Sequence, residues 1–73
     1  MAAHYMTPSE YEAFCVENVD RWARLYAGAV ERDLMSLSGW YAEKLSEAEY
    51  QLAKCGWDWE AIEEIEIAAY KAA

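Results

Sequence analysis

A strong helix start followed by a long apolar stripe constrains the fold of this 73-residue chain more than any other feature. Thr7 and Glu10 have the spacing of a capping box, and Pro8 between them supplies first-turn geometry without losing a hydrogen bond. Apolar residues then recur at helical spacing over nearly half of the helix circumference. These residues are Tyr11, Cys15, Val19, Trp22, Tyr26, Ala29 and Val30, flanked by Phe14 and Leu25. A stripe this wide can contact two neighbouring helices at once.

The outer side of the same segment carries opposite charges four residues apart. Glu17 precedes Arg21, and Asp20 precedes Arg24. Each pair is expected to stabilise a helix by about 0.2 to 0.5 kcal/mol. This side is therefore interpreted as a solvated face.

The first helical pattern is predicted to bend or end between Glu31 and Ser36, because Asp33 falls on the apolar side. We place its end near Ser36, which gives a first helix over residues 8–36. Ser38 then becomes a candidate cap for a second helix.

The second helix is predicted over residues 40–55 and the third over residues 59–72. Gly56 is the expected terminator of the second helix, and Asp58 is the expected cap of the third. Trp57 can pack on Ile62 as a hydrophobic staple. The apolar stripe of the second helix is narrower and consists of Tyr41, Leu45, Ala48, Leu52 and Cys55.

No apolar and polar alternation is long enough to predict a strand, and no repeat or linker divides the chain. We therefore expect one all-α domain over residues 1–73, a small antiparallel three-helix bundle preceded by a flexible segment, residues 1–6. The competing architecture completes its core as a homodimer, with an interface centred on Val19, Trp22 and Tyr26.

The chain carries 14 acidic and six basic residues, which gives a formal net charge of −8. Such a charge opposes direct binding to nucleic acid and to anionic membranes, and it favours basic protein surfaces. The hydrophobic content of 56% argues against disorder. Two widely spaced cysteines and the lack of a long apolar run predict a soluble, cytoplasmic protein, in the host cell if the chain is encoded by a phage.

Residues suited to catalysis are scarce. His4 is the only histidine and precedes the first helix, so no histidine-based metal motif is present. Cys15 and Cys55 fall on apolar stripes, where a cysteine is more often a small buried hydrophobe than a nucleophile. The acids from Glu43 to Glu66 are expected on convex outer faces. The sequence therefore predicts no enzymatic activity, no cofactor and no metal.

The third helix has two faces of different character. One face is an ordinary core face, formed by Ala61, Ile62, Ile65, Ala68, Ala69 and Ala72. The other combines carboxylates with large apolar groups, and consists of Trp59, Glu60, Glu63, Glu64, Glu66, Ile67 and Tyr70. Acids three or four residues apart on this face repel one another in the free protein. Bulky rings framed by such acids are typical of an interface with a basic partner.

The second helix carries a similar group of Glu43, Glu47 and Tyr50, and we include it in the predicted partner-binding surface. These residues predict a non-enzymatic module that blocks a basic surface, most plausibly the nucleic-acid groove of another protein. In size, charge and lack of a catalytic motif, the chain is similar to small acidic inhibitors of phages and mobile elements, including anti-CRISPR proteins and other nucleic-acid mimics. The alternative is a homodimeric structural or regulatory module without an inhibitory role.

Overall fold

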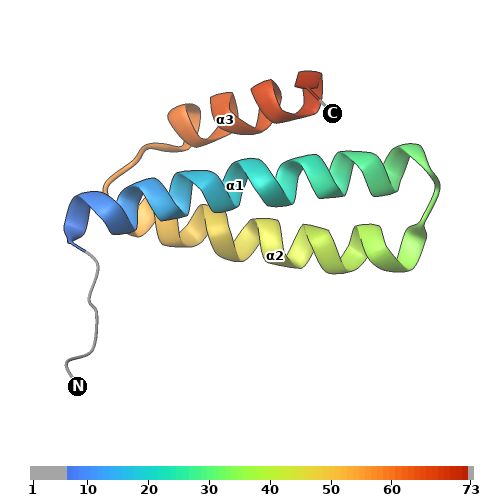
Figure 1. Cartoon of the computed structure of the whole chain (residues 1–73), viewed down its shortest axis with the longest axis horizontal. Helices are drawn as coiled ribbons and strands as arrows, with labels where there is room; N and C mark the ends of the chain where they lie inside the picture. Colours follow the sequence, from blue (N-terminus) through green and yellow to red (C-terminus); the bar gives the residue numbers. More distant parts are fainter. Residues whose placement is uncertain (1–6, 73) are drawn as a thin grey trace.

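The computed structural model describes residues 7–72 and forms three helices in the order α1, α2, α3 (Figure 1). Helix α1 spans Pro8–Glu31, α2 spans Met35–Lys54 and α3 spans Trp59–Ala72. The predicted all-α fold and three-helix bundle are confirmed. The predicted flexible segment 1–6, with His4, lies outside the described residues. Within residues 7–72, no helix has the length and apolar character needed to cross a membrane.

Helix α1 begins at the predicted capping box. The backbone N–H of Glu10 donates to the Thr7 hydroxyl oxygen at 3.2 Å, and the Thr7 N–H donates to the Glu10 carboxylate at 2.8 Å. This second bond favours the ionised acid and lowers the pKa of Glu10. Both halves of the motif are present, so the start of α1 is fixed by local sequence.

The junction between α1 and α2 lies earlier than predicted. Helix α1 ends at Glu31, within the predicted range from Glu31 to Ser36, and α2 already begins at Met35. The specific boundaries at residues 36 and 40 are therefore wrong. Asp33 adopts a left-handed conformation with φ of 58°, and the N–H groups of Asp33 and Leu34 donate to the carbonyls of Val30 and Ala29, which is a Schellman motif. Ser38 is therefore not a cap. It lies inside α2, where its hydroxyl donates to the Met35 carbonyl at 2.9 Å.

The junction between α2 and α3 follows the prediction. Gly56 has a φ of 100°, and the N–H groups of Gly56 and Trp57 donate to the carbonyls of Ala53 and Leu52, which is a second Schellman motif. The Asp58 carboxylate accepts a hydrogen bond from the Ala61 N–H at 2.9 Å and caps α3. Trp57 is half-buried against the core, as expected for a staple residue.

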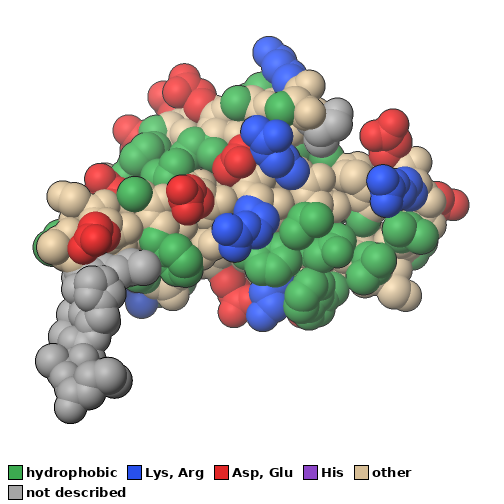
Figure 2. All heavy atoms as spheres, viewed as in Figure 1, with side chains coloured by type: hydrophobic (Ala, Val, Ile, Leu, Met, Phe, Trp, Pro, Cys, Tyr) green, Lys and Arg blue, Asp and Glu red, His purple; other side chains and the backbone are tan. Residues whose placement is uncertain are grey.

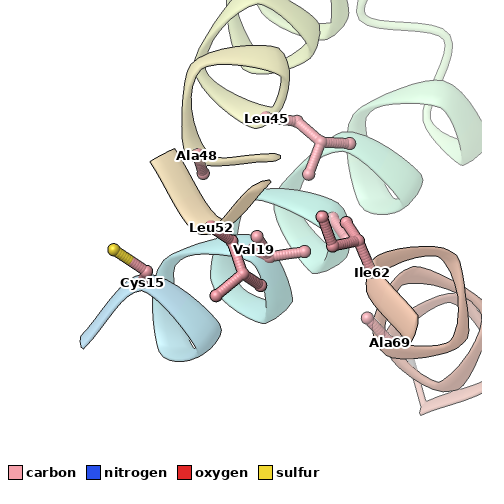
Figure 3. Close-up of a cluster of buried hydrophobic side chains, with 8 residues drawn as sticks. Cys15, Val19, Leu45, Ala48, Leu52, Ile62 and Ala69 are labelled. Carbon is pink, nitrogen blue, oxygen red and sulfur yellow. The ribbon is translucent and has the colours of Figure 1, made fainter. Parts of the chain in front are cut away.

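Helix α1 lies in the middle of a flattened molecule whose Cα atoms extend 44 × 32 × 18 Å (Figure 1). Helix α2 runs antiparallel to α1, whereas α3 runs in the same direction as α1 and packs mainly on it, with little contact to α2. The wide stripe of α1 thus contacts two neighbours, as its width suggested. In Figure 3, Val19, Leu45 and Ile62 converge from the three helices at the centre of the core.

The buried core is built from few and mostly small side chains. In the described range it consists of Cys15, Val19, Ala23, Ala29, Leu45, Ala48, Leu52, Ile62 and Ala69. Ala68 and Ala72, predicted on the core face of α3, are exposed because α3 has only one close neighbour. Val19 is fully buried among the chain's own helices, and Tyr26 packs its ring beside Tyr70 with the centroids 6.5 Å apart. Val19 therefore leaves no surface for a second chain, whereas Tyr26 is only half-buried.

Candidate partner-binding surface

The outward side of α3 presents large apolar side chains next to carboxylates. Trp59 is 59% exposed, Ile67 is 44% exposed and Tyr70 is 39% exposed. The acids Glu60, Glu63 and Glu64 between them are exposed as well. Because Ile62 is buried against the core, Glu60, Glu64 and Ile67 on the opposite side of α3 face away from α1, whereas Tyr70 lies at the edge of this side. We call these six residues, Trp59, Glu60, Glu63, Glu64, Ile67 and Tyr70, the α3 outer face.

Glu66 is not exposed like Glu60, Glu63 and Glu64, with which it was predicted to share the outer face of the third helix. Its side chain is half-buried, and it accepts a hydrogen bond from the Tyr70 hydroxyl at 3.4 Å. Burial raises the pKa of Glu66 to about 7, with further contributions from a hydrogen bond to Glu49 of α2 and from that residue's charge. The expectation that every acid from Glu43 to Glu66 lies on a convex face is therefore wrong for Glu66.

Glu49 is the residue that sequence reasoning missed. It is half-buried at the side of α2 next to α3, four residues after the buried Leu45 and directly after the buried Ala48. On the helix, Glu49 lies next to the apolar stripe that contains Leu45 and Ala48, and this position could have predicted its partial burial. Glu49 and Glu66 together place two carboxyl groups between α2 and α3, where the two helices have little other contact.

Tyr70 combines an exposed ring edge with a desolvated hydroxyl. Burial of the hydroxyl raises the pKa of Tyr70 to about 12, and the neighbouring carboxylate of Glu66 acts in the same direction. The Tyr70 side chain is therefore held between Tyr26 of α1 and Glu66 of its own helix. It serves the docking of α3 as well as the outer surface.

The three α2 residues predicted to bind a partner, Glu43, Glu47 and Tyr50, are exposed, but lysines lie beside two of them. Glu47 forms an ion pair with Lys44 at 3.5 Å and borders a groove between α1 and α2, not the α3 outer face. The centroid of the Tyr50 ring lies 4.9 Å from the Lys54 ammonium nitrogen. Glu43 is exposed on the outer side of α2. The densest uncompensated acidic surface is thus on α3, and the α2 residues are secondary to it.

Two cysteines lie in the described part of the chain. Cys15 is buried, and burial raises the pKa of the half-buried Cys55 thiol, which disfavours the reactive thiolate. Within residues 7–72, no three His, Cys, Asp or Glu side chains lie close enough together to hold a metal ion. The α3 outer face presents exposed rings and carboxylates.

Comparison of the chain with protein-family models, with curated proteins and with solved structures finds no match.

Proposed function

We propose that this chain is a non-enzymatic binding module whose α3 outer face occupies a basic surface of a partner protein. The observation that carries the proposal is the exposure of Trp59 and Ile67 among Glu60, Glu63 and Glu64. Exposed aromatic and aliphatic groups serve as anchors in interface centres, and charged residues form the rim around them. A helix that served only to cover a core would gain nothing from exposing these side chains.

The spacing of the acids favours a partner surface that otherwise binds nucleic acid. Glu60, Glu63 and Glu64 span about 6 Å along the helix axis, because the rise is about 1.5 Å per residue. Their negative charges therefore average roughly one per 2 to 3 Å of helix length. Double-stranded DNA carries one charge per about 1.7 Å and each strand one per about 3.4 Å. A groove lined with Lys and Arg for phosphates would therefore meet a similar charge density on α3.

Blocking such a groove requires no chemistry from the chain. The module would act one to one, by occupying the cationic side chains that the partner needs for nucleic acid. Association would be fast and steeply dependent on salt, since opposite net charges steer the encounter. The apolar anchors would slow dissociation once the complex has formed.

The test is affinity capture from the native host, comparing the wild-type chain with a variant that carries Glu60→Gln, Glu63→Gln and Glu64→Gln. The control variant carries Glu12→Gln, Glu17→Gln and Glu31→Gln on α1, which changes net charge by the same amount. We expect the wild type and the control to enrich the same basic protein and the α3 variant to lose it, with helicity by circular dichroism equal in all three.

The captured protein, once identified by mass spectrometry, provides the second measurement. Adding the wild-type chain should displace nucleic acid from it, and Trp59→Ala should weaken that displacement without reducing helicity. Equal capture by the α3 variant and the wild type would refute the electrostatic model. Loss of folding in Trp59→Ala would show that this ring supports the fold instead.

A further inference from the structure

A second surface lies along the seam between α1 and α2, and it contains no residue of α3. One hollow of about 250 Å³ is lined from α1 by Tyr11, Phe14 and Asn18 and from α2 by Lys44 and Gln51, among others. A second hollow of about 240 Å³ lies nearer the turn between the two helices. It is bordered by Arg24, Leu25, Arg32, Leu34, Leu37 and Tyr41, together with small residues of α1.

An aromatic cluster separates the two hollows. Trp22 of α1 meets Trp40 of α2 edge to face, with ring centroids 5.6 Å apart and an interplanar angle of 87°. The centroid of the Tyr41 ring lies 5.4 Å from that of Trp40 and 6.0 Å from that of Trp22. The Lys44 ammonium lies 5.7 Å from the centroid of the Trp40 ring. The cluster is therefore held in place within one chain, which preorganises the seam for contact with another molecule.

Large apolar side chains remain open to solvent along this seam. They are Tyr11, Phe14, Leu25, Leu37 and Trp40, with exposed fractions from 38% to 48%. Their exposed parts sum to an area on the order of 400 Å², which lies within the range of functional patches on monomers. Figure 2 shows hydrophobic side chains gathered over α1 and α2 toward the turn that joins them. With a polar rim, such a patch approaches the roughly 800 Å² per partner of a stable interface.

The charges of this seam are compatible with a second copy of the same chain. Arg24 pairs with Asp20 at 3.0 Å and Lys44 pairs with Glu47, so four charged groups near the seam neutralise one another. The α3 outer face, in contrast, would bring uncompensated glutamates of two copies together. In a chain of net charge −8, the seam is therefore the surface where two copies can approach with little repulsion.

Two exposed charges of α1 add self-complementarity. Glu17 and Arg21 are four residues apart, yet among the described residues no ion pair joins them, contrary to the expected helix pair. Under a two-fold axis perpendicular to α1, the two copies of α1 run antiparallel and exchange contacts reciprocally. Glu17 of one copy can then meet Arg21 of the other, twice in one interface.

We propose that two copies of the chain form a symmetric dimer through this seam, with α1 and α2 of one copy packed against α1 and α2 of the other. The exposed rings and leucines form the shared apolar layer, and both α3 outer faces stay on the outside. The dimer uses a surface separate from the one proposed to bind a basic partner, so either proposal can fail without the other.

The test measures molar mass by light scattering across a range of concentrations. Leu37→Glu places a charge in the seam, and Ile67→Glu is a matched control on α3, because both wild-type side chains are 44% exposed. We expect twice the chain mass for the wild type and for Ile67→Glu. Leu37→Glu, present in both copies, should weaken dimerisation by about 100-fold or more while helicity is retained.

A charge exchange keeps the test decisive if Leu37→Glu unfolds. Glu17→Arg alone should weaken the dimer, and combining it with Arg21→Glu should restore it. A wild-type chain that is monomeric at every concentration overturns the proposal. So does a folded Leu37→Glu dimer of undiminished affinity, a dimer lost only in Ile67→Glu, or a series of larger species that would indicate head-to-tail contacts.

Discussion

Replacing Glu66 by Gln should change how the stability of this protein depends on pH. Glu66 lies between α2 and α3, beside Glu49 of α2 and the Tyr70 hydroxyl, and Tyr26 of α1 packs on the Tyr70 ring. Its pKa rises from the ordinary 4.5 to about 7 in the folded chain. The folded state therefore binds a proton that the unfolded state releases across this pH range.

The direction of the pH dependence follows from the difference between the folded and unfolded pKa of Glu66. Because the folded pKa is raised, the stabilising contribution is fully present below about pH 4.5 and is lost as the pH rises through about 7. If the whole rise in the pKa of Glu66 contributed to the free energy of unfolding, the contribution would be about 3 kcal/mol. Glu66 is only half-buried, so solvent screening reduces our expectation to about 1 to 2 kcal/mol. For a domain of this size, that corresponds to roughly 5 to 10 °C in melting temperature.

The assay is thermal unfolding followed by circular dichroism at pH 5 and pH 8, with Glu64→Gln as a control that removes an exposed acid from the same helix. We expect the wild type and Glu64→Gln to melt at a lower temperature at pH 8 than at pH 5. Glu66→Gln should lose most of this difference by gaining stability at pH 8. An unchanged pH dependence in Glu66→Gln, or an equal loss in Glu64→Gln, would refute the reasoning.

Four further substitutions test the helix ends and the core by thermal or urea unfolding. Gly56→Ala should destabilise the protein by about 1 kcal/mol because a φ of 100° strains alanine, whereas Gly39→Ala inside α2 should stabilise it by a similar amount; equal effects would contradict the assigned turn. Asp58→Ala should cost about 1 kcal/mol by removing the cap on the Ala61 N–H, and no loss would mean that water replaces the cap. Leu52→Ala should cost about 2 to 5 kcal/mol because this side chain is fully buried, and a cost below 1 kcal/mol would contradict its central place.

Local sequence rules predicted the features of the fold that depend on one turn of chain. The Thr7 cap, the Gly56 terminator and the Asp58 cap each require only neighbouring residues, and all three are confirmed. Asp33 correctly marked the break after α1, but the end of α1 was placed too late, near Ser36, and the rules failed at Ser38. Asp33 can adopt the left-handed conformation that ends α1, and Ser38 can bond back to a helix carbonyl, so a serine followed by glycine did not mark a loop.

The candidate site was predictable as far as helical periodicity determines which way a side chain points. Trp59 and Ile67 are exposed, as their positions on α3 indicated. Glu66 was misplaced because its burial depends on Glu49 of a different helix, and no single-helix pattern contains that contact. The seam between α1 and α2 was missed for the same reason, since it results from packing α3 on one side of α1 only.

The position of α1 between its two neighbours leaves large side chains exposed on two separate surfaces, the seam between α1 and α2 and the α3 outer face. The core between the helices is closed largely by alanines and other small side chains, so most large rings lie at its edge. A chain of this length buries only about 60% of its surface and gains little from rings that remain exposed. Under the two proposals, the exposed acids of α3 would attract a basic partner and repel a second copy, whereas the ion pairs near the seam would limit repulsion between copies. In the two proposals, the charge distribution would separate self-association from partner binding, and rings that the core leaves uncovered would supply different anchors for each: Phe14 and Trp40 in the seam, Trp59 on α3.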